Sequence, residues 1–139
     1  MLVQKARLLL ITLWAGSLWT IGYLVAPTLF ATLHDRVLAG VIAGSMFTTS
    51  AWVSLACGGA LLGVLGISKD LSAQQRKTLT IIAGSMLAVL ALNHFGLRPV
   101  MADAKALGDK ARFGMLHGVS MVMYLTQSVL ALVLVLKNR

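Results

Sequence analysis

Three histidines are the residues of this 139-residue chain best suited to chemistry: His34, His94 and His117. Neutral imidazoles bind Zn²⁺ or copper, and two of them can ligate a haem iron from both sides. No compact His-x-x-x-His spacing occurs, and Arg98, one helical turn after His94, would repel a bound cation. Two alternatives therefore stand, a metal or haem site and polar residues of a helix bundle, and the pattern favours the second.

Polar side chains recur along the last apolar segment at the spacing of one helix face. Such a stripe cannot face lipid cheaply, so it is expected to point into the bundle or into a wet crevice. An interior hydrogen-bond ladder and a binding crevice are the two alternatives for it. With two residues from the preceding segment, the candidate crevice comprises His94, Arg98, His117, Ser120, Tyr124 and Gln127.

Composition indicates that lipid surrounds the elements that carry these residues. Hydrophobic residues make up 58% of the chain, charged residues only 12%, and the mean hydropathy is +0.87. Four apolar segments are long enough to cross the bilayer as helices, at residues 8–30, 37–67, 78–97 and 113–136. The prediction is a single all-α domain over residues 1–139, an integral membrane four-helix bundle with up-down-up-down topology.

Two segments carry features that conflict with a simple straight span. The segment 37–67 is too long for a perpendicular crossing, so it is expected to tilt, to project from the membrane or to break near Gly58 and Gly59. Pro27, near the end of the first segment, is expected to bend or terminate that helix.

Basic residues suggest how the bundle is oriented. The N-terminus, the second connector and the C-terminus hold seven Lys and Arg residues, and the other two connectors hold five. Both termini are therefore predicted to face the cytoplasm of a bacterial inner membrane, with the bilayer as partner and no nucleic acid. The four aspartates all lie in connectors, and no catalytic motif occurs, so no enzyme activity is expected.

Glycines spaced four residues apart allow close helix contact. Such pairs pack helices within a bundle or between copies, so a homo-oligomer or a membrane protein partner is an alternative to internal packing. The three pairs are Gly40 and Gly44, Gly59 and Gly63, and Gly114 and Gly118.

Three stretches carry a family resemblance: WAGSLWTIGYLVAPTLFATLHDRVLAGVIAGSMF at residues 14–47, RPVM at 98–101 and FGMLHGVSMVMYL at 113–125. They resemble the transmembrane protein 205-like family, known in bacteria as domain of unknown function 4149. The resemblance implies a small four-helix membrane protein without an assigned activity, and its eukaryotic namesake is associated with tolerance of platinum drugs. The family pattern maps onto Pro27, Phe30, Arg98, Pro99, Phe113, Gly114, His117, Gly118 and Ser120.

The chain departs from the namesake in its shorter connectors and its single cysteine, so thiol-based platinum chemistry is not carried over. The main expectation is a non-enzymatic membrane protein that handles or tolerates a small molecule or metal ion through a polar crevice near the outer face. The favoured prediction is that the protein binds no cofactor. The alternatives are a haem- or copper-binding electron-transfer subunit, and a structural partner module in a membrane complex.

Overall fold

The computed structural model describes residues 1–139 and contains four long helices and no strands. The first combines α1 (Leu2–Trp19), a π-helical segment η1 (Thr20–Val25) and α2 (Ala26–Thr32), and the second is α3 (Arg36–Ile67). The third combines α4 (Ala73–Ala91), a second π-helical segment η2 (Leu92–Leu97) and α5 (Arg98–Ala106), and the fourth is α6 (Lys110–Lys137). All four are long and apolar enough to cross a membrane, which confirms the predicted all-α fold with four helices able to span it.

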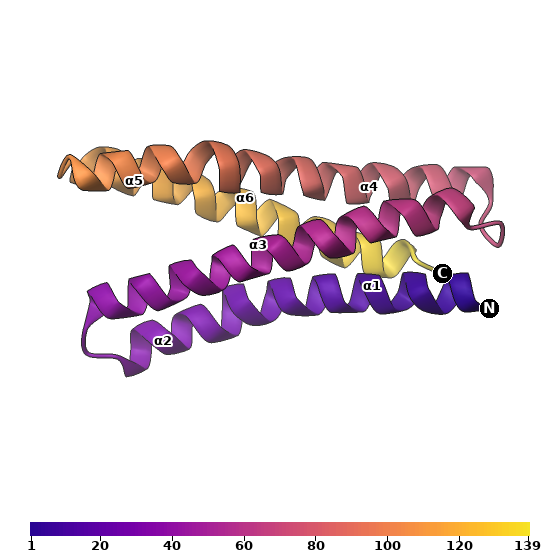
Figure 1. The fold of residues 1–139 in the computed structure, drawn as a ribbon, viewed down its shortest axis with the longest axis horizontal. Helices are drawn as coiled ribbons and strands as arrows, with labels where there is room; N and C mark the ends of the chain where they lie inside the picture. The colour runs from indigo at the N-terminus through magenta and orange to yellow at the C-terminus, as the bar shows by residue number, and fades with distance from the viewer.

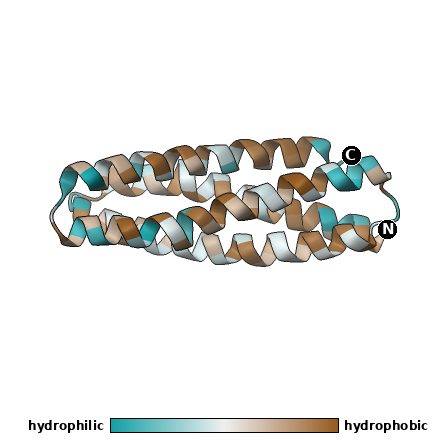
Figure 2. Cartoon of the chain, turned by 90° about the horizontal axis from the view of Figure 1, so that it is seen from above, coloured by the Kyte–Doolittle hydropathy of each residue, from teal (hydrophilic) through white to brown (hydrophobic).

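The helices form an elongated bundle in which α1 and α4 each pack against α3 and α6 (Figure 1). Both chain ends and the α3–α4 connection lie at one end, called here the terminal end. The connections after α2 and α5 lie at the other, distal end. Hydrophilic residues gather at both ends and hydrophobic ones lie between them (Figure 2), as expected for a bundle whose middle lies in hydrocarbon.

Aspartate and serine side chains fix where three helices begin. The Asp35 carboxylate accepts from two backbone N–H groups of α3 at 2.9 and 3.1 Å, and Asp109 accepts from one in α6 at 3.0 Å. Ser72 and Gln75 form a reciprocal capping box at the start of α4. These contacts satisfy N–H groups that have no partner within the helix.

Both prolines lie inside long helices, which corrects the sequence-based boundaries. Pro27 was expected to bend or end the first helix, and the third was expected to stop at residue 97. Instead the first helix continues to Thr32 and the third to Ala106. A proline lacks an N–H and crowds the carbonyl four residues earlier, and a π-helical segment directly precedes the α-helical turn that holds each proline. The wider turns let the helices continue.

Gly58 is a point of close contact rather than a break. The helix α3 runs without interruption through Gly58 and Gly59. A Cβ atom added to Gly58 would lie 2.6 Å from the Leu87 side chain and 2.8 Å from the Trp14 ring, so glycine leaves the space that these side chains of α4 and α1 occupy against α3. Trp14 is fully buried and belongs to a hydrophobic core of 14 buried residues, which extends from the middle of the bundle to its terminal end.

The glycines predicted to pack helices contact little within the chain. A Cβ added at five of them meets nothing within 4 Å, and one added at Gly44 meets only Arg98, at 3.6 Å. Close approach depends instead on Gly58 and on Gly22, which faces Tyr124. Packing between copies stays a prediction for the five open positions, Gly40, Gly59, Gly63, Gly114 and Gly118.

A buried arginine ties the terminal end together. Arg7 is 2% exposed, and its guanidinium pairs with Asp70 at 2.8 Å. It also donates to Asn138 Oδ1 at 2.7 Å and to Ser68 Oγ at 3.3 Å. One side chain thus joins the first helix, the α3–α4 connection and the C-terminus, and its hydrogen bond holds the pKa of the Asp70 carboxyl below its ordinary value.

Replacement of Gly58 by alanine should destabilise the bundle, because the added methyl group overlaps Leu87 and the buried Trp14 ring. Overpacking of this kind costs about 1–3 kcal/mol. The matched control is Gly59→Ala, where the methyl group meets no neighbour. Thermal unfolding in detergent should give a lower melting temperature for Gly58→Ala alone; equal melting temperatures would contradict the assigned contact.

The Arg7–Asp70 contact should weaken in acid. Folding lowers the pKa of Asp70. The stability that its ionised carboxylate contributes is therefore fully present above the unfolded-state pKa of about 3.9, and it is lost as pH falls through the lower folded-state pKa. Asp70→Asn should therefore have a lower melting temperature than wild type at pH 7, and this difference in melting temperature should become smaller below about pH 3.9. A difference that stays constant with pH would rule out ionisation of Asp70 as its cause.

Candidate functional site

A cavity of about 1020 Å³ lies between the four helices in the distal half of the bundle, and we call it the chamber. It is bounded by η1, α2, η2 and α5, by α3 as far as Ser54, by α6 as far as Gln127, and at its inner end by Leu18 of α1 and Leu90 of α4. Its walls are mostly apolar and carry no acidic side chain. The structure brings together around it all six residues predicted to form a crevice: His94, Arg98, His117, Ser120, Tyr124 and Gln127.

Arg98 is the charged residue held inside the bundle at this chamber. Its guanidinium donates to Thr48 Oγ1 at 2.8 Å and to the Gly44 carbonyl at 3.2 Å, both on α3. All of its partners are neutral, because the one ion pair in the structure joins Arg7 and Asp70. The positive charge of Arg98 therefore faces the chamber without a counterion from the protein.

The position of Arg98 along its helix places it near a membrane boundary. With a rise of 1.5 Å per residue, it lies about 13 Å from the middle of the helix Ala73–Ala106. The hydrocarbon core of a bilayer reaches about 15 Å from its midplane. If the helix is centred in the bilayer, the guanidinium lies close to the level where lipid headgroups begin.

Two of the three predicted histidines line the chamber, and the third does not. His34 is exposed in the α2–α3 connection, whereas His94 and His117 belong to the chamber wall. The ring of His117 stacks on Phe113 with centroids 5.9 Å apart. No three His, Cys, Asp or Glu side chains are grouped closely enough to hold a metal ion. The three histidines thus do not form a common ligand set.

Contact with Arg98 makes His94 a poor ligand for a metal ion. The Arg98 Nη1 atom lies 3.2 Å from His94 Nδ1, so that ring nitrogen is the acceptor of an arginine N–H. A metal ion bound by the same ring would lie close to a guanidinium cation and be repelled by it. The geometry therefore supports a role for His94 in orienting Arg98.

Aromatic side chains form the wall of the chamber towards the hydrophobic core. The Tyr124 hydroxyl donates to the Leu18 carbonyl, and its ring meets Phe47 edge-on with centroids 5.3 Å apart. Tyr23 donates to Ser128 Oγ at 2.9 Å. Gly22 leaves room for the Tyr124 ring, because a Cβ there would lie 2.2 Å from it. The phenols are thus held in place by contacts between the first and fourth helices.

Of the remaining polar groups, Ser120 is paired and Gln127 is not. Ser120 Oγ donates to Asn93 Oδ1 at 2.8 Å, which links α6 to η2. Gln127 is 2% exposed, and its amide Nε2 has no hydrogen-bond partner. A buried donor without a partner costs about 1–3 kcal/mol. Gln127 lines the inner end of the chamber, so the polar lining there includes an amide whose N–H has no partner.

Sequence patterns did not single out four polar residues that line the chamber: Ser50, Ser54, Asn93 and Lys105. Asn93 and Lys105 lie on the same long helix as Arg98. An amide inside an apolar run, one residue before His94, was an available signal for Asn93. Lys105 had no such signal, because the segment that holds it reads as a charged connector and is in fact helical.

The arrangement combines groups that could hold the two ends of one ligand. A cation lies near the membrane boundary, apolar walls extend inward, and a neutral donor lies deeper. Carboxylates for acid-base work are absent from the lining. Such a chamber fits a molecule with an anionic head and an apolar body.

A protein-family model described as Domain of unknown function (DUF4149) matches residues 9–110. The match covers the first three helices, including His94 and Arg98, and ends at the first residue of α6. No curated protein and no solved structure matches the chain.

Proposed function

The chain belongs to the DUF4149 family, and from the chemistry of its chamber we propose that it is a non-enzymatic membrane protein that binds a small anionic amphiphile from the bilayer. The proposal depends above all on Arg98. A guanidinium keeps its charge in proteins, and leaving that charge without a counterion in a low-dielectric site is costly. A carboxylate or phosphate brought by the ligand would supply the missing partner.

The size and lining of the chamber support a ligand with a substantial apolar part. About 1020 Å³ is at the upper end of the 300–1,000 Å³ that small-molecule sites typically occupy. With the anionic head at Arg98, the body of the ligand would lie inward against Phe47, Leu90 and Leu125. An acceptor atom at its far end would satisfy the unpaired amide of Gln127.

We further infer that the bundle crosses a bacterial inner membrane up-down-up-down, with both termini in the cytoplasm. The terminal end carries seven of the twelve Lys and Arg residues and one of the four aspartates, which supports this orientation. The chamber would then lie towards the outer face. Handling or tolerance of a metal ion, which the sequence left open beside a small molecule, stays a prediction and is not part of the proposal.

Reporter fusions test the orientation. Green fluorescent protein attached after Arg139 should fluoresce, because it folds in the cytoplasm, and alkaline phosphatase at the same position should be inactive. The matched control is fusion after Gly108, at the distal end, where the phosphatase should be active. The reverse pattern would place the chamber towards the cytoplasm.

Binding of dodecanoate tests the ligand class. The probe is radiolabelled dodecanoate added to protein in phosphatidylcholine nanodiscs, with empty nanodiscs as background and dodecanol as the uncharged competitor. Wild type should bind dodecanoate and prefer it to dodecanol. Arg98→Gln should lower dodecanoate affinity about tenfold or more, since hydrogen bonds to charged groups contribute about 1.5–3 kcal/mol.

The matched control is Lys110→Gln, which removes a positive charge at the same end but outside the chamber. It should bind dodecanoate like wild type. Because Arg98 also joins helices, Lys105→Gln serves as a second chamber variant and should weaken binding without breaking an interhelical hydrogen bond. Wild-type affinity in both chamber variants, or equal affinity for acid and alcohol, would refute the proposal.

A further inference from the structure

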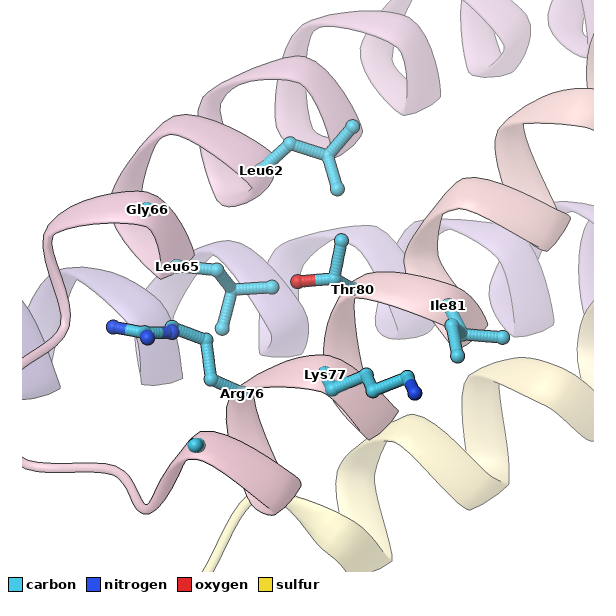
Figure 3. A pocket seen from close by; sticks show the side chains of 8 residues that line it. Leu62, Leu65, Gly66, Arg76, Lys77, Thr80 and Ile81 are labelled. Atoms are coloured by element: carbon cyan, nitrogen blue, oxygen red, sulfur yellow. The ribbon is translucent and has the colours of Figure 1, made fainter.

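A second pocket lies between α3 and α4 at the terminal end, away from the chamber (Figure 3). It measures about 410 Å³, and we call it the α3–α4 groove. Eight residues line it, and none of them is acidic. None of them lines the chamber, so the two sites are separate.

Two cations in the groove have no partner in the protein. Arg76 is half-buried and Lys77 is exposed, and neither forms an ion pair or a side-chain hydrogen bond. The nearby carboxylate of Asp70 is paired with Arg7 instead. Figure 3 shows the Arg76 and Lys77 side chains extending to opposite sides of the groove. The groove thus presents two positive charges that an anion could neutralise.

A free hydroxyl lies beside these cations. The hydroxyl of Thr78, two residues before Thr80 on α4, donates to the Gln74 carbonyl at 2.9 Å. Thr80 makes no such bond, and its oxygen points towards Leu65 in the groove (Figure 3). The hydroxyl is therefore available to donate to an oxygen of a bound anion.

The rest of the groove is apolar and open to an acyl chain. Leu62, Leu65 and Ile81 line it, and Ile81 is 56% exposed. Gly66 adds no side chain, and a Cβ built there meets nothing within 4 Å. Cationic and apolar parts therefore adjoin in a single groove, as the headgroup and chain of a lipid require.

The depth of these residues fits a lipid at the membrane boundary. At 1.5 Å per residue, Thr80 lies about 14 Å and Arg76 about 20 Å from the middle of the helix Ala73–Ala106. The hydrocarbon core ends about 15 Å from the midplane. The hydroxyl is thus at the level of the glycerol ester groups and the guanidinium at the level of the phosphates.

We propose that the α3–α4 groove binds an anionic phospholipid. Arg76 would hold its phosphate, Lys77 would add positive charge on the other side of the groove, Thr80 would donate to a glycerol ester oxygen, and one acyl chain would extend inward past Leu62 and Ile81. Basic pockets between membrane helices bind lipid headgroups in this way. The lipid would hold α3 to α4 on the outer side of the bundle. This inference does not depend on the function proposed for the chamber.

Native mass spectrometry of the detergent-purified full chain tests the proposal, with phosphatidylglycerol and phosphatidylcholine as the two probes. Wild type should retain phosphatidylglycerol in preference to phosphatidylcholine. The double variant Arg76→Gln/Lys77→Gln should lose that preference, with about a 25-fold fall in phosphatidylglycerol affinity, because each of the two basic residues near a membrane surface contributes about fivefold.

The matched control is Lys69→Gln/Lys137→Gln, which removes two exposed charges from the same end but outside the groove. It should keep the preference, and an equal fall in both double variants would overturn the site in favour of general attraction to a basic surface. Gly66→Leu should weaken binding by filling the groove without changing charge, whereas Gly59→Leu, on the same helix outside the groove, should not. Unchanged binding in Gly66→Leu would also overturn the proposal.

Discussion

Hydrocarbon offers no hydrogen-bond partner to a peptide group, and the architecture of this protein depends on that constraint. Each long helix must satisfy its own backbone from one end to the other, even where a proline removes an N–H. A π-helical segment precedes Pro27 and another precedes Pro99, and each helix continues past its proline. Both segments contribute residues to the chamber wall, Gly22 and Tyr23 from the first and Asn93 and His94 from the second. Backbone irregularity and the candidate site therefore coincide, as is common for π-helical turns.

The two halves of the bundle differ in how they are filled. From the middle of the bundle to its terminal end, 14 buried residues form the hydrophobic core, and Gly58 leaves space there for side chains of α1 and α4. In the distal half, the same four helices surround a chamber lined by Arg98 and by aromatic and hydroxyl side chains. The packed half fixes the positions from which the helices enter the other half. A cation can then be held across the chamber by neutral acceptors on α3 without collapse of the space around it.

Hydropathy predicted the number and approximate positions of the helices. A helix needs about 20 mostly apolar residues to cross the hydrocarbon core, and such runs are visible in the sequence. Hydropathy missed residues 98–106, since a polar helix outside the hydrocarbon looks like a connector. The polar residues gathered at the chamber were predictable, because polar groups in lipid must face inward. The separation of His34 from the other two histidines was not predictable, since it depends on the path of a short connection. Glycine spacing alone also failed to distinguish Gly58, which packs, from Gly59 beside it, which does not.

Arg7 lies at the opposite end from the chamber, and its contacts make the two ends of the bundle unlike each other. By joining the first helix, the α3–α4 connection and Asn138, it restrains the terminal end through a single buried side chain. The distal end has only the short connections after α2 and α5 and few buried apolar contacts. Segments with fewer such contacts open at lower free energy than a packed core. We therefore expect the terminal end to resist deformation more than the distal end, so that a ligand entering the chamber would separate the distal helix ends while the terminal ends stay together.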